Sequence, residues 1–252
     1  MKRPITTLFL MMSLDGKIST GATDDLDFDK DFPKIIGLKE GLHQYYEIEH
    51  TTDLWSLNSG RVQAKVGVNE KPFTDKCDVS FVVIDNSHLK YHGLEYFSKQ
   101  SKCFVLVTSN KEHPAFEMRN GSGSGSGSGS SSGSGSSSSS GSGSSSDNIN
   151  IILQNTFDPA EMLAILFDDY GCERITIQTG GTLNEIFLRA KLLDYVDIIV
   201  APVLIGGKDT ATVIDGDSLR AENDLSKIGV LQLIEFTTLN NSYVRLRYKV
   251  IY

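Results

Sequence analysis

Short apolar runs alternate with amphipathic segments along most of the chain, and this alternation predicts its elements. A continuous run of apolar and β-branched residues indicates a buried strand, whereas apolar positions that recur every three or four residues indicate a helix. Before residue 121 these patterns predict strands at 5–12, 54–57, 79–84 and 103–107, and helices at 38–50, 59–65 and 94–100. The polar, acidic stretch 20–31 carries neither pattern and is predicted to be an irregular loop.

The second half of the chain contains clearer start and stop signals. Asp158-Pro159 places an N-cap and a first-turn proline before an apolar stripe, and Gly171 marks the end of that helix. Thr182-Leu183-Asn184-Glu185 has the pattern of a capping box, so a second helix is expected to begin there and to run to about Lys191. Strands are predicted at 149–153, 174–178 and 195–201, followed by an antiparallel hairpin of 231–238 and 243–251.

The order of these elements predicts the fold class. Strand and helix alternate up to the hairpin, which favours an α/β fold with a mostly parallel sheet covered on both faces and antiparallel strands at one edge. The 26 residues from Gly121 to Ser146 are only Gly and Ser, a composition typical of a flexible coil. We therefore expect a single domain over residues 1–252, interrupted by this tract at 121–146, with its two flanking parts packed together.

Composition narrows the classes of function. Hydrophobic residues make up 39% of the chain, enough for a packed core, and the formal net charge of −8 disfavours nucleic acid as a partner. No apolar run is long enough to predict a membrane span. Three cysteines without a C-x-x-C pair predict free thiols and a cytoplasmic location, and the spacing of the five histidines gives no reason to expect a metal.

Two pairs of glycines follow predicted strands. Gly180-Gly181 lies between a strand and a helix start, where backbone N–H groups and the helix dipole can hold a phosphate; a tight turn that binds nothing accounts for this pair equally well. Gly206-Gly207 follows the next strand. Because ligands of open α/β sheets bind outside the carboxyl ends of the strands, a shared cleft is favoured over two ordinary loops. Neither pair forms the G-x-G-x-x-G fingerprint.

A hydroxyl and a carboxylate follow the first predicted strand, in Ser13-Leu14-Asp15-Gly16. Their place at a strand end fits a polar group of a ligand site, and a plain surface turn is the alternative. The segments Ser13 to Ile18, Thr179 to Leu183 and Leu193 to Gly207 together resemble the RibD C-terminal family, reductases of the dihydrofolate-reductase-like superfamily. The resemblance covers nearly the whole chain outside the Gly/Ser tract, and the order and spacing of its motifs carry it.

This resemblance implies a fold and an activity. The fold is a dihydrofolate-reductase-like three-layer sandwich, with a mostly parallel central sheet flanked by helices and a C-terminal antiparallel hairpin. The activity is that of an NADPH-dependent oxidoreductase resembling 5-amino-6-(5-phosphoribosylamino)uracil reductase of riboflavin biosynthesis. Such an enzyme transfers a hydride to a C=N or C=O group of a pyrimidine- or pteridine-like small molecule. A homodimer is also implied.

The resemblance further implies which residues form the site. The residues expected to bind NADPH lie at the ends of four strands: Asn58, Gly60, Arg61, Thr108, Ser109, Gly180, Gly181, Thr182, Leu183, Gly206 and Gly207. Ser13 and Gln178 are expected to contact the substrate. Asp15 is the candidate catalytic residue, which orients the substrate or supplies the proton that must accompany hydride transfer.

Three positions depart from the family pattern. Arg61 replaces a threonine, Lys65-Val66-Gly67 replaces an acidic run with proline, and Gln178 replaces a glutamate that faces the substrate in many members. The zinc deaminase half of bifunctional members has no counterpart in this sequence. Two other hypotheses therefore accompany the reductase: a non-catalytic nucleotide-binding module of the same fold, and an interaction protein that uses the sheet as a dimer scaffold.

Overall fold

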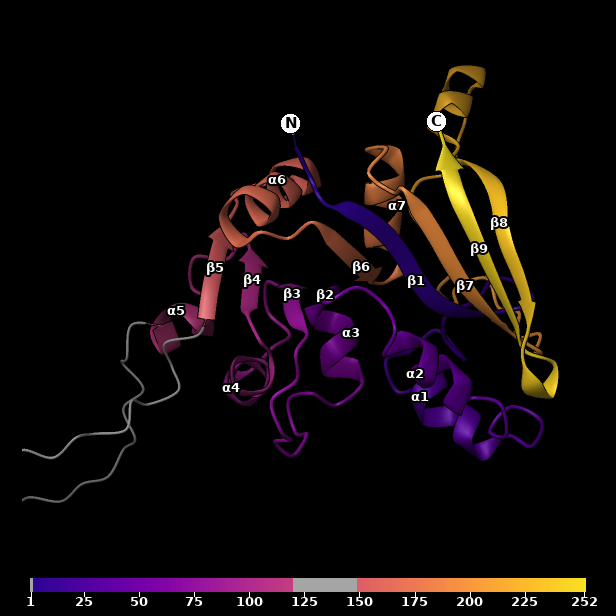
Figure 1. Ribbon diagram of the computed structural model, residues 1–252, viewed down its shortest axis with the longest axis horizontal. Coiled ribbons are helices and arrows are strands. Elements are labelled where there is room, and N and C mark those ends of the chain that lie inside the picture. Colours follow the sequence, from indigo (N-terminus) through magenta and orange to yellow (C-terminus); the bar gives the residue numbers. More distant parts are fainter. Residues whose placement is uncertain (1, 120–148) are drawn as a thin grey trace, which may run out of the picture.

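The computed structural model describes residues 2–119 and 149–252, so the Gly/Ser tract 121–146 lies outside the described residues. Within the described ranges, nine strands form one sheet in the order β5-β4-β3-β2-β6-β1-β7-β9-β8 (Figure 1). The strands are β1 (Ile5–Ser13), β2 (Trp55–Ser59), β3 (Ser80–Ile84), β4 (Phe104–Thr108), β5 (Ile149–Leu153), β6 (Arg174–Gln178), β7 (Tyr195–Ala201), β8 (Val230–Thr238) and β9 (Val244–Ile251). Neighbours from β5 to β7 pair in parallel, whereas β9 runs antiparallel to both β7 and β8.

Helices cover both faces of this sheet. They are α1 (Phe28–Asp31), α2 (His43–Glu49), α3 (Gly60–Lys65), α4 (Tyr91–Gln100), α5 (Pro114–Arg119), α6 (Pro159–Tyr170) and α7 (Gly181–Arg189). Figure 1 shows α6 and α7 over one face and α1 to α4 over the other. The α/β fold class predicted from the sequence, with its mostly parallel sheet and antiparallel C-terminal strands, is confirmed.

Alternation along β1 explains how the two layers are held. Leu8 and Leu10 belong to the apolar cluster under α6 and α7, whereas Phe9 and Met11 belong to the cluster that contains Phe28 of α1. Side chains of a strand point to opposite faces in turn, so one apolar run serves both layers. All four of these β1 side chains are buried, and each contributes about 1.5–3 kcal/mol through burial.

The register of the central strands brings their carboxyl ends to one edge of the sheet. Ser59 at the end of β2 lies opposite Ile84 at the end of β3, and Asn58 lies opposite Gln178 at the end of β6. The chain passes directly from β2 into α3 and through a glycine turn from β6 into α7. Two short helix starts therefore lie side by side at this edge.

Helix starts show where the sequence patterns succeed and fail. Asp158 caps α6 as predicted, accepting hydrogen bonds from two backbone N–H groups, and Gly171 ends it with a φ of 65°. The predicted capping box at Thr182 is wrong: α7 begins at Gly181, and its N-cap Gly180 supplies no side chain. A pattern of residue types cannot separate a cap from a first turn when glycines precede it.

Three further differences concern short elements. Residues 28–31, predicted as irregular, form the single turn α1, and α5 has no counterpart among the predicted helices. The helix expected over 38–50 is confined to His43–Glu49, because residues 36–42 form turns. None of the helices in the described ranges is long and apolar enough to span a bilayer.

Candidate functional site

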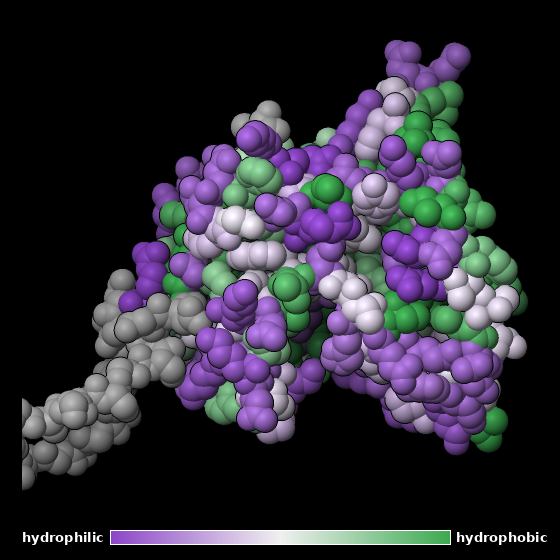
Figure 2. Space-filling model, viewed as in Figure 1, coloured by the Kyte–Doolittle hydropathy of each residue, from purple (hydrophilic) through white to green (hydrophobic). Residues whose placement is uncertain are grey.

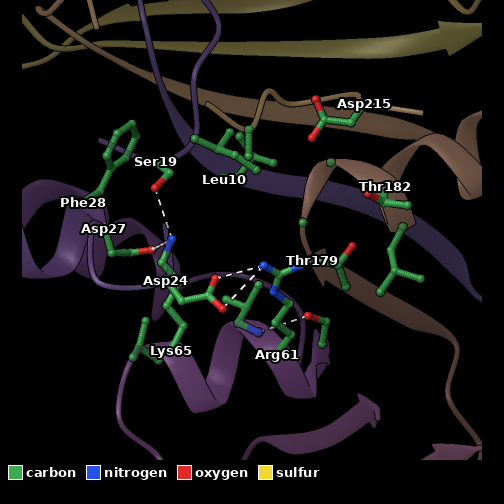
Figure 3. Close-up of a pocket in the computed structure, with 18 of the residues that line it drawn as sticks. Leu10, Ser19, Asp24, Asp27, Phe28, Arg61, Lys65, Thr179, Thr182 and Asp215 are labelled. Carbon is green, nitrogen blue, oxygen red and sulfur yellow. Dashed lines mark hydrogen bonds and ion pairs between the residues drawn. The ribbon is translucent and has the colours of Figure 1, made fainter. Parts of the chain in front are cut away.

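A cavity of about 700 Å³ opens at the carboxyl ends of β2, β3 and β6. Its walls come from residues 178–183 at the start of α7, from one side of α3, from residues 208–211 after β7, and from an acidic segment that we define as residues 24–29. Figure 3 shows α3 and the acidic segment facing the α7 start across this space. The volume lies within the range of about 300–1,000 Å³ that is typical of small-molecule sites.

The α7 wall consists of backbone. Gly180 is the N-cap of α7 and no side chain caps this helix. The first N–H group that bonds within the helix is that of Asn184, which donates to the carbonyl oxygen of Gly180 at 3.0 Å. The N–H groups of residues 181–183 precede this bond and have no acceptor within the helix. Together with the helix dipole they form a site suited to an anion.

Packing explains why residue 181 is a glycine. A Cβ atom at Gly181 would lie 2.3 Å from the carbonyl oxygen of Thr212 and 2.4 Å from Oδ2 of Asp215, far inside van der Waals contact. At Gly180 the nearest neighbour of such an atom would be a methyl group of Val62 at 3.9 Å. Residue 181 thus seals the helix against the loop behind it, while residue 180 borders the cavity and the first turn of α3.

The α3 wall consists of charged side chains. Lys65 forms an ion pair with Asp27 at 2.9 Å and donates to the hydroxyl of Ser19 at 3.1 Å. Arg61, one turn earlier, forms an ion pair with Asp24 at 3.1 Å (Figure 3). The side chains of Lys65 and Asp27 are both 13% exposed, whereas those of Arg61 and Asp24 are 64% and 58% exposed. We call these the inner pair and the outer pair.

Carboxylates outnumber cations around the cavity. Six aspartates and three Lys or Arg residues line it, namely Asp24, Asp27, Asp29, Asp85, Asp209 and Asp215 against Arg61, Lys65 and Lys208. An anionic ligand therefore depends on backbone N–H groups and on these few cations. Within the described ranges, no cluster of three or more His, Cys, Asp or Glu residues could hold a metal ion.

Gln178 is held by residues that sequence reasoning missed. Its Oε1 accepts a hydrogen bond from the Ser56 hydroxyl at 2.7 Å, and its Nε2 donates to Glu49 of α2. Asp29 lines the cavity close by and accepts a hydrogen bond from the Tyr46 hydroxyl at 2.7 Å. Gln178 thus contacts one carboxyl group, of Glu49 in α2, and shares the cavity with a second, of Asp29 in α1.

The environment raises the pKa of both of these carboxyl groups. Desolvation by burial is the main cause for Glu49, and the charge of Asp29 adds to it, while Gln178 opposes the shift. Asp29 retains surface open to the cavity, but the protein around its carboxylate desolvates it and raises its pKa, against the hydrogen bond from Tyr46. A raised pKa is what a carboxyl group needs in order to deliver a proton near neutral pH.

A second buried carboxylate lies at the end of β3. Asp85 accepts hydrogen bonds from the backbone N–H groups of His88 at 3.0 Å and Leu89 at 2.8 Å, and faces Nε2 of the buried His113 at 3.1 Å. Burial would raise the pKa of Asp85, but the hydrogen bonds from His113 and the two N–H groups outweigh it and lower the pKa. Asp85 is therefore an anion that fixes the turn after β3, which forms one end of the cavity.

The structure brings part of the predicted site together. Six predicted residues line the cavity: Arg61, Gln178, Gly180, Gly181, Thr182 and Leu183. Eight are not among its lining residues: Ser13, Asp15, Asn58, Gly60, Thr108, Ser109, Gly206 and Gly207. Most of these eight support the walls from behind, so their predicted contacts with a ligand stay predictions.

Three of these residues hold other residues of the site in place through hydrogen bonds. Asn58 is buried and donates to the hydroxyl of Ser56, which in turn holds Gln178. Thr108 and Ser109 both donate to Oδ1 of Asn86, a cavity residue.

The two remaining glycine sites are also structural. Gly60 begins α3 and packs directly against the side chain of Asp85. Gly206 and Gly207 have φ angles of 72° and 83°, and this left-handed turn leads into residues 208–211 of the cavity wall.

Asp15 occupies a different place from the one expected of a proton donor. Its carboxylate accepts hydrogen bonds from the Ser13 hydroxyl at 2.6 Å and from the backbone N–H groups of Ile205 at 3.1 Å and Gly206 at 2.6 Å. These three bonds, that from Ser13 most of all, lower the pKa of Asp15 to about 2. An exposed carboxylate with this pKa is ionised at neutral pH, so the geometry argues against proton supply by Asp15. It fastens the end of β1 to the loop after β7.

Comparison with known proteins agrees with this architecture. The RibD C-terminal domain family matches residues 130–244. The 2,5-diamino-6-ribosylamino-4(3H)-pyrimidinone 5′-phosphate reductase of Methanothermobacter thermautotrophicus is 39% identical over 49 residues, which cover 19% of this chain and 23% of that protein. The chain thus aligns with about a quarter of the length of this curated relative. These matches confirm the resemblance predicted from the sequence.

Solved structures share the fold over nearly the whole chain. Acinetobacter baumannii RibD superposes with a TM-score of 0.62 at 14% identity, over 99% of this chain and 58% of that one. A pyrimidine reductase-like protein from Corynebacterium diphtheriae superposes with a TM-score of 0.61 at 13% identity, over 99% of this chain and 92% of that one. At such low identity the likeness shows the fold.

Proposed function

We propose, from the premise that residues 130–244 match the RibD C-terminal domain, that this protein is an NADPH-dependent reductase of a pyrimidine-like substrate. The observation that carries the proposal is the α7 start. Its N–H groups have no acceptor in the helix, and it opens with Gly180 into a cavity of cofactor size, with Arg61 on the facing helix. Backbone donors and one guanidinium are the groups that hold a pyrophosphate.

The residues present fit such a cofactor. The N–H groups of residues 181–183 and the Thr182 hydroxyl would hold its phosphates, with Arg61 as the cationic partner. When bound, NADPH supplies the hydride. The chain supplies orientation and a walled site, because Gly181 fixes α7 against the loop 212–215 and Asp15 fixes the loop that carries residues 208–211.

The proton for the reaction requires a separate group. We assign it to Asp29, which lines the cavity and whose pKa is raised mainly by desolvation and further by the charge of Asp27. Glu49 is the neighbouring carboxyl group, and the charge of Asp29 helps to raise its pKa in turn. Protonation of the acceptor nitrogen or oxygen by Asp29 would balance the charge that hydride addition leaves there. Asp15 and Ser13 are then positioning residues, and Gln178 shapes the substrate end of the cavity through Ser56 and Glu49.

The proposal also covers the substrate, the oligomeric state and the location of the protein. The relatives named above make a 5′-phosphorylated ribosylaminopyrimidine the first substrate to test, and riboflavin biosynthesis the first pathway. Hydrophobic side chains gather along the β8–β9 edge (Figure 2), where Val230, Leu233 and Phe236 are exposed, which supports a homodimer through this edge. The three free thiols fit a cytoplasmic location.

Thermal unfolding with NADPH and with NADH tests cofactor binding. A ligand at about 100 times its dissociation constant stabilises the folded state by about 2.7 kcal/mol. We expect a rise in melting temperature with NADPH. No rise with either nucleotide would favour the interaction-protein hypothesis and would refute the reductase.

Turnover separates the reductase from a nucleotide-binding module. Loss of NADPH absorbance would be followed with 2,5-diamino-6-ribosylamino-4(3H)-pyrimidinone 5′-phosphate and with 5-amino-6-(5-phosphoribosylamino)uracil. Oxidation with either compound supports the reductase and identifies the pyrimidine. Binding of NADPH without oxidation by either would support the non-catalytic module.

A further inference from the structure

The acidic segment places carboxylates on both cations of α3. Asp24 lies on Arg61 and Asp27 lies on Lys65, and all four residues line the cavity (Figure 3). The third cation of the cavity, Lys208, comes from the loop after β7. Two of the three cations that could hold an anionic ligand are therefore already paired within the protein.

The two pairs differ in what it takes to break them. The inner pair is shielded from water, and Lys65 is held by Ser19 as well as by Asp27. Asp27 is also the N-cap of α1, where its side chain accepts a hydrogen bond from the N–H group of Asp29. The outer pair is exposed on both sides. An exposed ion pair is weak, whereas an uncompensated buried charge is costly.

The outer pair joins Arg61 to an acceptor of the same chemical kind as a phosphate. One nitrogen of Arg61 lies 3.1 Å and 3.4 Å from the two carboxylate oxygens of Asp24. Carboxylate and phosphate present the same kind of oxygen acceptors to arginine. Arg61 precedes Val62 in the chain, and a methyl group of Val62 lies 3.9 Å from the position that a Cβ atom of Gly180 would take at the α7 start. The carboxylate of Asp24 thus occupies a cation next to the backbone anion site.

We infer that Arg61 is a phosphate-binding residue which Asp24 holds in reserve, so that a ligand phosphate binds by displacing the carboxylate of Asp24. The inner pair stays closed in this exchange and anchors the segment through Asp27. The inference rests on the proposed function for the location of the ligand, and it adds that Asp24 sets ligand affinity by competition. The shared ligand chemistry is a phosphate group, which either the nucleotide or a 5′-phosphorylated substrate can supply.

The neighbouring residue Asp25 provides a matched control. It is exposed, carries the same charge and does not line the cavity. Asp24→Asn and Asp25→Asn therefore change the net charge equally, and only the first frees Arg61. Because both side chains are exposed, we expect both variants to keep the melting temperature of the parent protein.

The experiment measures dissociation constants of NADPH and of ribose 5-phosphate for the parent protein, Asp24→Asn, Asp25→Asn, Arg61→Ala and the double variant Arg61→Ala with Asp24→Asn. We expect Asp24→Asn to tighten binding of at least one probe by up to about fivefold relative to Asp25→Asn, the range of an exposed ion pair. Arg61→Ala should weaken binding of that probe, and adding Asp24→Asn to it should produce no further change.

The probes separate the two sources of phosphate. An effect on NADPH alone assigns Arg61 to the nucleotide, and an effect on ribose 5-phosphate alone assigns it to the substrate. Equal affinities of Asp24→Asn and Asp25→Asn for both probes would overturn the inference, as would a gain from Asp24→Asn that persists without Arg61. If the parent protein binds ribose 5-phosphate with the expected pattern but no NADPH, the proposed function fails and the inference stands. If it binds neither probe, both fail.

Discussion

The two walls of the cavity both offer groups that can bind an anion, but the groups differ in kind. The α7 wall offers backbone N–H groups whose direction is fixed by the helix and whose position is fixed by Gly181 against residues 212–215. The α3 wall offers Arg61 and Lys65, each paired with a carboxylate of the acidic segment. The first wall has no charge that can be neutralised, while the second depends on ionised side chains throughout.

This difference separates a binding site of fixed strength, on α7, from one whose strength depends on conditions, on α3. Backbone donors keep their strength whatever the pH, because their partial charges do not titrate. Exposed ion pairs weaken with salt, and a competing anion can replace one partner. We therefore expect the α7 wall to determine whether a phosphate binds and the α3 wall to determine how tightly it binds.

The largest effect is expected on turnover, from a substitution in the acidic segment. Asp29→Asn removes the carboxyl group that we assign to proton delivery and should lower turnover by about 10²-fold or more, while NADPH binding is retained. Because the pKa of Asp29 is raised, activity of the parent protein should fall as the pH rises through that pKa, and the variant should lose this dependence. Single-turnover rates across the pH range would test this. Full turnover in Asp29→Asn would reassign the proton.

One added methyl group should disturb the α7 wall. Gly181→Ala forces its Cβ atom against Thr212 and Asp215, and overpacking of this kind costs about 1–3 kcal/mol of folding stability. Nucleotide affinity should fall with it, because the helix start moves. Gly180→Ala is the matched control, since its Cβ position lies at an ordinary contact distance of 3.9 Å from a methyl group of Val62. Chemical denaturation and NADPH titration of both variants would measure the effects, and equal stabilities would contradict this account of Gly181.

The inner pair tests the anchor of the acidic segment. Asp27→Asn keeps a good N-cap for α1 but leaves the shielded ammonium of Lys65 without its counter-ion, which should cost about 1–2 kcal/mol of stability. Asp24→Asn, which breaks the exposed pair, should cost less. Urea unfolding of the two variants in parallel gives the comparison. A larger loss from Asp24→Asn would reverse the order of the inner and outer pairs.

The smallest effect is expected at Asp15, which holds the loop after β7. Its pKa is lowered from 3.8 to about 2 in the folded protein, so its ionised form favours folding above pH 4. That contribution should be lost as the pH falls from about 4 to 2. Thermal unfolding of the parent protein and of Asp15→Asn should therefore differ at neutral pH and converge near pH 2. A constant difference across this range would show that ionisation of Asp15 is irrelevant.

The sequence was sufficient for the parts that depend on local patterns. Runs such as 174–178 and 195–201 are strands with the predicted bounds, and the glycine turn at 180–181 leads from a strand into a helix as expected. Local patterns could not predict the structure of the acidic segment. The single turn α1 has too few residues to show a helical period, and it is held by tertiary contacts such as that of Phe28 with the core.

The carboxyl groups near Gln178 illustrate the same limit. Glu49 reaches Gln178 although 129 positions separate them along the chain, and Tyr46 of α2 holds Asp29 of α1. Such pairs are created only when the layers pack, so no spacing rule reveals them. The one signal in the sequence is Gln178 itself, which stands where the resemblance implies a glutamate.

The place of β1 has a consequence for how the molecule forms. This strand, made before both of its neighbours, pairs on one side with β6 and on the other with β7, so that Thr7 lies beside Thr176 and Tyr195. During synthesis its neighbours do not yet exist, and the middle of the sheet must wait until most of the chain has left the ribosome. Contacts of such long range slow folding and expose apolar strands meanwhile. The walls of the cavity come from residues 9–88 and 178–215, so ligand binding reports that these two parts of the chain have come together.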